Sequence, residues 1–368
     1  RVSKRLFPPS RNFLFFVVIL HSETTPISLA IITFDEGDNV MALFRQLFSE
    51  KQDSRPFEVI AVHNGGSNFT LECLDQARAL SPVPFTIIQA PQNSLGHSRK
   101  LAIEAAKSPL VAFVDGDCQV PEGWLSQLRE QLHHCLGQDP KTAGVGGPNR
   151  ADPSSTFGQT LNLALASPLG HGGTAQGHWV DQLTKTDHLP TTNALFRRDK
   201  VLAVGNFDSS FSRTCEDVDL GVRLNRAGFS LFMGPGPVVV NRCAEGWREW
   251  LERMKRFGYS QARWVSLKRS GLHGPSVLSA FGIQGFLCLP LLGLAWPKLL
   301  GLYAAYGGLL IIESWRLYKL HRQLNQLFPV VGVLAITHFA YGWGSLRGYL
   351  DLLLGLNKVQ AAKISQTG

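Results

Sequence analysis

The stretch V-A-F-V-D-G-D-C-Q, from Val111 to Gln119, is an apolar run that ends in two aspartates one residue apart. Its apolar residues predict a buried β-strand. Because side chains alternate along a strand, Asp115 and Asp117 point to the same side of its carboxyl end. Two adjacent carboxylates suit Mg²⁺ or Mn²⁺, which in turn hold a diphosphate. The alternative is a polar exit from the strand with two solvated acids, and only the surrounding sequence distinguishes the two.

Segments of strand and helix character alternate around this stretch. The predicted strands are 27–33, 57–63, 85–89, 111–115 and 143–147, and the predicted helices are 39–49, 70–80, 96–107 and 121–136. This order predicts an α/β fold with a mostly parallel sheet and helices on both faces. Ligands bind such sheets beyond the carboxyl ends of the strands. Three polar clusters, at 33–36, 63–67 and 115–117, fall at such ends.

Length, charge and cysteine content narrow the class of protein. The chain has 368 residues, a formal net charge of +8 and a pI near 9.3. It is longer than the roughly 100–200 residues of one domain, so we expect two units. The positive charge indicates an anionic partner: a nucleotide diphosphate, anionic lipid headgroups or nucleic acid. The six scattered cysteines form no C-x-x-C pair, which argues against a disulfide framework or a zinc site.

The sequence beyond Gly271 is apolar enough to enter a membrane. Residues 277–296 and 299–312 carry no charge, and residues 328–346 are almost entirely apolar. A span needs about 20 apolar residues, so two to three membrane helices are expected, although a soluble core can hide one such helix. Basic residues lie before the first stretch and between the second and third. The positive-inside rule therefore predicts a multi-pass protein of the cell membrane, with its α/β sheet in the cytoplasm.

These features divide the chain into five parts. We expect an N-terminal extension at 1–26, the α/β domain at 27–240, a basic interfacial helical segment at 241–273, the membrane region at 274–357 and a tail at 358–368.

Three shorter stretches carry further expectations. The apolar run 13–20 predicts an extra strand or an interfacial segment, with a truncated signal anchor as the alternative. Residues 149–189 are rich in Gly, Ser, Pro and His, which predicts long mobile connections of the kind that form lids or bind acceptors. Eight Lys or Arg lie between Arg242 and Arg269. Because this stretch abuts the membrane region, its expected anion is a lipid headgroup and not nucleic acid.

Two of the strand-end clusters allow a binding and a structural interpretation. Thr33, Asp35 and Glu36 lie where a nucleoside can be bound, but Asp35 or Asp38 is also placed to cap the following helix. Asn64, with the two glycines after it, forms a tight turn that lets a ligand approach the backbone closely, or is simply a turn.

Two helix starts also carry unusual charges. Arg99 lies in the first turn of a predicted helix, where a cation opposes the helix dipole; this indicates a nearby anionic ligand, with a solvated arginine as the alternative. Glu216, Asp217 and Asp219 crowd three acids into four residues. Such crowding raises a carboxyl pKa and suits a general base. The alternative is helix capping, with Arg223 and Arg226 as partners one turn away.

The order of these clusters is more specific than any one of them. Strand–Thr-x-Asp, strand–Asn-Gly, N-x-x-G-x-x-R, Asp-x-Asp and Glu-Asp follow one another in the chain, and this order resembles the family 2 glycosyltransferases of the GT-A fold over about residues 27–270. Within that family the chain is most similar to membrane-associated enzymes of exopolysaccharide and succinoglycan-type synthesis. G-G-P-N-R at 146–150, S-P-L-G-H-G at 167–172 and R-F-G-Y at 256–259 carry this narrower resemblance.

The resemblance implies where the donor would bind. Thr33, Asp35 and Asn64 would line the pocket for the nucleotide base and ribose, and Arg99 would lie near the nucleotide. Asp115 would contact the ribose or the metal, and Asp117 would ligate the Mn²⁺ or Mg²⁺ that bridges the diphosphate.

The resemblance also implies the chemistry. Asp217 would be the base that deprotonates an acceptor hydroxyl, with Glu216 beside it, and Thr192 and Asn193 would face the acceptor or the donor sugar. Three basic residues would close over the leaving diphosphate: Arg253, Lys255 and Arg256. The implied reaction moves a sugar from a nucleotide-diphosphate sugar to a hydroxyl of a lipid-linked or saccharide acceptor near the membrane. Direct displacement inverts the anomeric configuration.

Three departures bear on this implication. The family often has an acid where this chain has His63, which leaves the nucleotide base open and makes a catalytically inactive, membrane-anchored nucleotide-sugar-binding or scaffolding protein the alternative function. Q-A-R-W at 261–264 is one residue short of the Q-x-x-R-W of processive synthases, which favours a single addition. A nucleotidyltransferase is disfavoured, because acidic residues replace its Gly-rich basic loop after the first strand.

Overall fold

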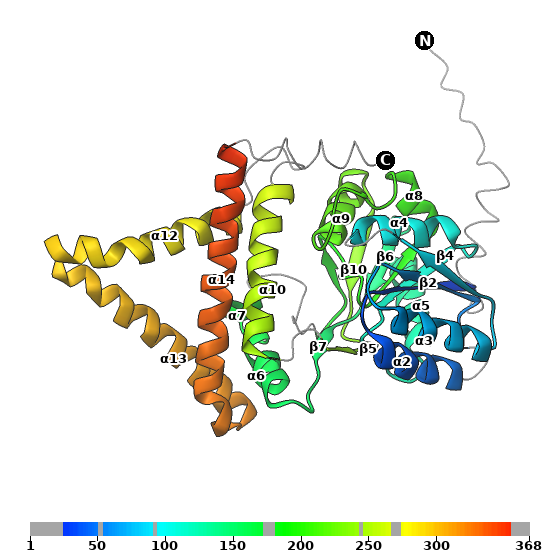
Figure 1. Cartoon of the computed structure of the whole chain (residues 1–368), viewed down its shortest axis with the longest axis horizontal. Coiled ribbons are helices and arrows are strands. Elements are labelled where there is room, and N and C mark those ends of the chain that lie inside the picture. Colours follow the sequence, from blue (N-terminus) through cyan, green and yellow to red (C-terminus); the bar gives the residue numbers. More distant parts are fainter. Residues whose placement is uncertain are drawn as a thin grey trace, which may run out of the picture.

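The stretch around Asp115 forms the centre of an eight-stranded sheet whose order is β3-β2-β1-β4-β9-β6-β10-β8 (Figure 1). The strands are β1 (Ile27–Thr33), β2 (Glu58–His63), β3 (Phe85–Gln89), β4 (Leu110–Asp115), β6 (Thr142–Gly146), β8 (Thr184–Thr186), β9 (Ala194–Arg197) and β10 (Ser230–Met233). The first four are parallel to one another, whereas β9 runs antiparallel to both β4 and β6. The predicted mostly parallel sheet is therefore confirmed. The computed structural model describes residues 25–50, 54–90, 94–171, 181–242, 246–265 and 274–354, so the run 13–20 and the tail 358–368 lie outside the described residues.

Helices cover both faces of this sheet. They are α2 (Gly37–Ser49), α3 (Asn68–Leu80), α4 (Leu95–Ala105), α5 (Trp124–Gln138), α8 (Arg198–Ala203) and α9 (Glu216–Arg226). Every residue of β1 is buried, and its alternate side chains serve different cores: Leu29 and Ile31 pack with α2 and α5, and Ala30 and Ile32 pack with α4 and α9. A strand buried on both faces has no polar side, which explains the unbroken apolar run of its sequence.

A second, three-stranded sheet lies beside the carboxyl end of β4. It has the order β5-β11-β7, with β5 (Cys118–Gln119), β7 (Asn149–Ala151) and β11 (Val239–Asn241). β11 pairs antiparallel with β5, so that Asn241 is opposite Cys118. This pairing brings a residue from near the predicted domain boundary next to the Asp115–Asp117 turn.

The remaining helices form a second body beside the sheet domain (Figure 1). They are α6 (Thr156–Leu165), α7 (Pro168–His171), α10 (Trp247–Ser260), the π-helix η2 (Gln261–Val265), α12 (Gly274–Ala295), α13 (Gly301–His321) and α14 (Leu327–Leu353), with the short 3₁₀ turns η3 (Pro297–Leu300) and η4 (Leu324–Gln326). α10 and α14 run side by side at very close range. A Cβ atom on Gly344 would lie 2.1 Å from the backbone oxygen of Lys255, so only glycine permits this contact.

The predicted mobile connection at 149–189 is wrong in its first half. Residues 156–165 form α6, and a shared apolar core joins this helix to α10, α13 and α14. Ser155 caps α6 by accepting a hydrogen bond from the Gly158 amide at 2.9 Å. The composition missed this helix because its apolar face is buried against segments far along the chain, which no local pattern records.

Among the described residues, one helical stretch is long and apolar enough to cross a membrane, Leu324–Leu353, and Val277–Leu287 is a shorter apolar stretch. α12 and α13 diverge from α14 and reach away from the sheet domain as a V (Figure 1). They expose large apolar side chains, among them Leu278, Phe281, Leu287, Leu294, Leu309, Ile311, Ile312 and Leu320. Two to three membrane crossings stay a prediction.

Candidate active site

A cavity of about 220 Å³ opens at the carboxyl ends of β1, β2 and β4. Its lining residues are Ile32, Thr33, Phe34, Glu36, Asn64, Leu95, Asp115, Asp117, Thr192, Asn241 and Arg253. Seven of these were singled out from the sequence: Thr33, Glu36, Asn64, Asp115, Asp117, Thr192 and Arg253. The cavity therefore opens at the edge of the sheet where the topology of parallel strands predicts a ligand.

Three carboxyl groups concentrate negative charge in this cavity. Burial raises the pKa of Asp117 to about 6, and the charge of Asp115 adds to the rise while Arg253 opposes it. Burial raises the pKa of Glu36 to about 7, helped by the charges of Asp117, Asp115 and Asp35, although a hydrogen bond from the Phe34 amide counteracts it. A cation in the cavity would relieve this repulsion.

The donor set fits a divalent cation that shares its coordination with a ligand. In the part of the chain that the structure describes, no three His, Cys, Asp or Glu side chains are grouped closely enough to hold a metal ion on their own. Mg²⁺ and similar ions are commonly bound by one or two carboxylates together with substrate phosphates and water. Asp115 and Asp117 offer two carboxylates, and Glu36, which was expected near the nucleoside, lines the same cavity.

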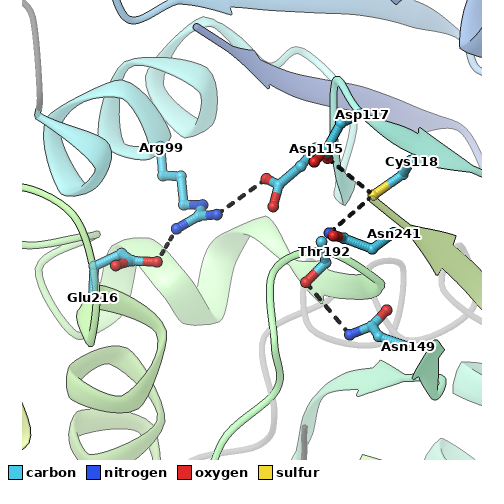
Figure 2. Close-up of polar contacts among 8 residues, drawn as sticks. All are labelled: Arg99, Asp115, Asp117, Cys118, Asn149, Thr192, Glu216 and Asn241. Atoms are coloured by element: carbon cyan, nitrogen blue, oxygen red, sulfur yellow. Dashed lines mark hydrogen bonds and ion pairs between the residues drawn. The ribbon is translucent and has the colours of Figure 1, made fainter. Parts of the chain in front are cut away.

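Arg99 connects the cavity to the start of α9 (Figure 2). Its Nη2 atom lies 3.2 Å from Oδ1 of Asp115, and its Nη1 atom donates to Oε1 of Glu216. The side chains of Arg99 and Glu216 are almost fully buried, whereas Asp115 is 31% exposed. The first amides of α4 are already occupied, since Leu95 and Gly96 donate to the backbone oxygens of Ser212 and Phe211. The anions that pair with the Arg99 guanidinium are thus two carboxylates of the protein itself, those of Asp115 and Glu216.

The three acids at the start of α9 differ in their partners. Glu216 pairs with Arg99, and Asp219 pairs with Arg223 at 2.7 Å, as the capping interpretation predicted. Asp217 is half-buried, and its Oδ1 accepts a hydrogen bond from the Val218 amide at 2.8 Å. Within the described residues Asp217 forms no ion pair, in contrast to Glu216 and Asp219. It does not line the 220 Å³ cavity itself.

The expected nucleotide pocket is built by two neighbouring strand ends. The Asn64 amide donates to the Thr33 backbone oxygen at 2.7 Å, and its side-chain Oδ1 accepts from the Ser94 amide at 3.0 Å. Asp35 accepts from the Ser67 amide at 2.6 Å and so joins the first strand end to the start of α3. Gly66 has a φ of +104°, and a Cβ atom there would lie 2.1 Å from the Phe34 backbone oxygen. The turn thus requires glycine.

His63, the departure from the family pattern, lies under this pocket. Its side chain is buried, and its Nδ1 is 3.3 Å from Oγ1 of Thr33. Burial lowers the pKa of the imidazole, partly offset by the charge of Asp35. The residue that lines the cavity is its neighbour Asn64.

Thr192 and Asn193 are adjacent in sequence but differ in surroundings. Thr192 lines the cavity, and its Oγ1 accepts from Asn149 Nδ2 at 3.4 Å (Figure 2). Asn193 is fully buried: it accepts from the Trp124 indole at 2.9 Å and donates to the backbone oxygens of Pro148 and Pro237. These bonds hold the loop that presents Thr192.

Asn241 is a cavity residue that sequence reasoning missed. It ends β11, and its Nδ2 lies 3.5 Å from Sγ of Cys118, next to Asp117 (Figure 2). Its Oδ1 is buried without a hydrogen-bond partner among the described residues. No local signal in the sequence marks Asn241, because the V-V-N end of β11 reaches the cavity only through the pairing of β11 with β5.

The three predicted basic residues of α10 lie at different places. Arg253 lines the cavity. Lys255 pairs with Glu252 at 2.7 Å. Partial burial lowers the pKa of Arg256, and the like charges of Arg253 and Arg213 lower it further, with Glu252 opposing them. Arg253 thus adds a positive charge to a cavity that is also lined by three acidic side chains, an arrangement that suits a bound diphosphate with its cation.

Comparisons with known proteins agree with this geometry. The Glycosyl transferase family 2 model matches residues 28–204, and the Glycosyl transferase family group 2 model matches residues 170–346. Glycosyltransferase AglE of Haloferax volcanii is 24% identical over 72% of this chain and 82% of its own length. The succinoglycan biosynthesis protein ExoM of Rhizobium meliloti is 23% identical over 75% of this chain and 87% of its own.

A solved structure shows the same fold. The mannosyltransferase PcManGT from Pyrobaculum calidifontis, determined with GDP-Man and Mn²⁺, superposes with a TM-score of 0.52 over 88% of this chain and 94% of its own, at 16% sequence identity. The expected GT-A fold is thereby confirmed.

Proposed function

Because this chain belongs to glycosyl transferase family 2 and uses a nucleotide-sugar donor, we propose that it transfers the sugar, with inversion, to a hydroxyl of a lipid-linked or membrane-near acceptor. The observation that carries this proposal is the 220 Å³ cavity, in which Thr33, Asn64, Asp115, Asp117 and Arg253 meet at the carboxyl edge of the sheet.

The donor is bound in this proposal by the groups that line the cavity. Thr33 and Asn64 contact the nucleoside, with Asp35 fixing the turn beside them. Asp115 and Asp117 hold a divalent cation, Mn²⁺ or Mg²⁺, and the Mn²⁺ bound by PcManGT supports this choice. When bound, the cation would neutralise the charge that develops on the departing diphosphate. Arg253 adds a fixed positive charge at the same place, with Arg256 further along α10.

Proton transfer is assigned to Asp217. In one step its carboxylate takes the proton of the acceptor hydroxyl, that oxygen forms a bond to the anomeric carbon, and the bond from the anomeric carbon to the diphosphate oxygen breaks. The products are the glycosylated acceptor and the nucleoside diphosphate. Glu216 is the positioning residue beside the base, since its buried pair with Arg99 fixes the first turn of α9. A single displacement needs no second, nucleophilic carboxylate.

Membrane attachment through α12, α13 and α14 completes the proposal. The exposed apolar side chains of α12 and α13 and the membrane-length stretch Leu324–Leu353 support it. Arg316, Lys319 and Arg322 follow the apolar part of α13, which supports a multi-pass arrangement with the sheet domain on the cytoplasmic side.

A donor panel tests the function. The purified chain is incubated with nucleotide-diphosphate sugars and Mn²⁺, and released nucleoside diphosphate is measured with and without a membrane extract as the source of acceptor. We expect release from one donor that depends on both Mn²⁺ and the extract, and NMR of the product then gives the anomeric configuration. Binding of a nucleotide sugar without any release would instead identify the inactive binding protein. A product with retained configuration would contradict the direct displacement.

A further inference from the structure

A second cavity, of about 480 Å³, lies between β7, α6 and the end of α13. Its volume falls in the range of roughly 300–1,000 Å³ that is typical of ligand pockets. Prolines, leucines and an alanine form its apolar walls, and its polar lining residues are Asn149, Arg150, Gln159, Asn162, His321 and Gln323. None of the described residues that line it is acidic. The cavity therefore suits an amphipathic ligand with hydroxyl groups and a negative charge.

Asn149 joins this cavity to the active-site cavity. It lines the 480 Å³ cavity, and its Nδ2 donates at 3.4 Å to Thr192, which lines the 220 Å³ cavity (Figure 2). This bond fixes the orientation of the Asn149 side-chain amide and uses its Nδ2, so its Oδ1 is the polar atom that is left over. That Oδ1 is buried and has no hydrogen-bond partner among the described residues. Buried polar atoms are nearly always paired, so this oxygen is an unpaired acceptor on a residue that lines the cavity, and a ligand hydroxyl that reached it would satisfy it.

Two other amides keep the cavity in shape. Asn162 exchanges hydrogen bonds of 2.9 Å with both backbone groups of Ala151, and Gln159 donates to the Pro153 backbone oxygen at 2.9 Å. Both residues belong to α6, whose apolar face is packed against α14. The cavity is therefore built from a helix and a strand that are fixed to each other.

Two of the lining residues, His321 and Gln323, lie where a membrane surface is expected. His321 is the last residue of α13, and Gln323 lies just before the short turn that leads into α14. Under the proposed topology the basic stretch around Arg316 and Arg322 faces the cytoplasmic headgroups. A lipid phosphate at that depth would meet His321 and Arg150, and a saccharide attached to it would extend past Asn149 toward Thr192.

We propose that the 480 Å³ cavity binds the acceptor, a saccharide joined through phosphate to a lipid, with Asn149 Oδ1 accepting a hydrogen bond from a sugar hydroxyl. This assignment rests on the proposed function, because it names the substrate that receives the sugar. The proposal assigns acceptor binding to the polar residues between β7 and α13, which do not line the donor cavity.

A photoreactive farnesyl diphosphate tests the lipid-phosphate part of the site without any transfer reaction. The full chain in detergent is labelled, and mass spectrometry identifies the modified peptides. Labelling is expected within residues 148–166 and at 321–323. Ala166 is exposed and lines the cavity, so Ala166→Trp fills it and is expected to reduce labelling roughly tenfold. Thr156 is exposed on the same helix outside the cavity, so Thr156→Trp is the matched control and should label like the unmodified chain.

Competition separates the two sources of a lipid phosphate. Unlabelled farnesyl diphosphate should displace the probe, and phosphatidylglycerol at the same concentration should not. Equal displacement by both lipids would identify a general phospholipid site and overturn the acceptor assignment. Equal labelling of Ala166→Trp and Thr156→Trp would overturn it as well.

Kinetics tests the saccharide part of the site. Asn149→Ala removes the unpaired oxygen and is expected to raise the KM for the acceptor roughly tenfold while the KM for the donor stays unchanged. If the unmodified chain transfers sugar and the acceptor KM of Asn149→Ala is unaltered, the cavity assignment is wrong and the proposed function stands. If the unmodified chain transfers no sugar to any lipid-linked acceptor, the proposed function fails, whatever the probe binds.

Discussion

The carboxylate of Asp115, at the end of β4, lies 3.2 Å from the guanidinium of Arg99, which reaches it from the first turns of α4. The second nitrogen of that guanidinium contacts Glu216, the residue before the proposed base. A single buried arginine thus connects the donor cavity to the helix that carries Asp217. An ion pair of this kind contributes little net stability when intact, but it is costly to break because the remaining charge stays buried.

Replacing Arg99 is therefore expected to destabilise the fold. Arg99→Met leaves Glu216 buried without its cation, and the free energy of unfolding should fall by about 3–5 kcal/mol. The double variant Arg99→Met with Glu216→Gln should regain part of this loss. Denaturant unfolding followed by fluorescence measures both. Lys100→Met is the control, since the side chain of Lys100 is 40% exposed and its pair with Glu104 is 4.0 Å long; an equal loss there would contradict the argument.

Asp117 is expected to be essential for metal-dependent transfer. Asp117→Asn keeps the shape of the side chain but removes a carboxylate from the cavity, so transfer should fall on the order of a hundredfold or more and require higher Mn²⁺ concentrations. Nucleoside diphosphate release over a Mn²⁺ titration measures the effect. Asp75→Asn, at an exposed residue of α3 that pairs with Arg78, should behave like the unmodified chain. A normal Mn²⁺ dependence in Asp117→Asn would refute the metal assignment.

Asp217 is expected to affect turnover and not donor binding. Asp217→Asn removes the proton acceptor, so kcat should fall by about 10²–10⁴-fold. The KM for the donor and the unfolding midpoint should stay unchanged, because Asp217 lies outside the donor cavity and the structure gives it no ion pair among the described residues. Stopped assays with the identified donor give both constants. Sugar transfer at an undiminished rate would show that another group is the base.

The pKa of Glu36 predicts an unusual dependence of stability on pH. The folded state raises this pKa from 4.5 to about 7, so between these values the folded chain binds more protons than the unfolded chain. The contribution of Glu36 to the free energy of unfolding therefore falls as the pH rises from about 4.5 to 7. In metal-free protein, Glu36→Gln should lose less stability across this window than the unmodified chain.

Thermal unfolding in the presence of EDTA measures this difference at each pH. Glu72→Gln, on an exposed face of α3, is the control and should follow the unmodified chain. Parallel curves for Glu36→Gln and the unmodified chain would show that Glu36 does not titrate in this range. Mn²⁺ affinity should change in the opposite direction and increase with pH through about 6 to 7, because Asp117 and Glu36 bind a cation only after they lose their protons.

Membrane topology is tested with introduced cysteines at Lys298, between α12 and α13, and at Arg322, after α13. If α12 and α13 cross as a hairpin, an impermeant maleimide should label Lys298→Cys in intact cells and Arg322→Cys only after permeabilisation. The unmodified chain gives the background from its own cysteines. Labelling of both sites only after permeabilisation would indicate that the helices lie on the cytoplasmic surface.

Much of the sheet domain was predictable because its signals are local. β1 and β4 are buried on both faces, so they appear in the sequence as unbroken apolar runs that end in polar residues. Thr33, Asn64 and Asp115 follow such runs directly, and parallel strands bring their carboxyl ends to one edge of the sheet. These residues meet in one cavity for that reason.

The residues that sequence reasoning missed lack such a local signal. Asn241 enters the cavity only because β11 pairs with β5. Asn149 belongs to a stretch that the sequence singled out, but its hydrogen bond to Thr192 joins residues that are 43 positions apart. Arg99 was singled out as a residue near the nucleotide, but its partners in the structure are protein carboxylates 16 and 117 residues away. Contacts over such separations depend on the packing of whole elements, which a pattern of neighbouring residues does not record.

The position of Asp115 was therefore determined by the sequence itself, since the apolar strand β4 ends at this residue. Asp117 follows in a turn, where strand alternation no longer applies, but its closeness in sequence keeps it at the same edge of the sheet. Only the tertiary structure decided what surrounds them. It placed Glu36 and Asn241 in the same cavity, coupled Asp115 through Arg99 to α9, and opened a second cavity beside Asn149. The physical reason is that strand periodicity acts between adjacent residues, whereas burial and charge pairing act between whatever residues the folded chain brings together.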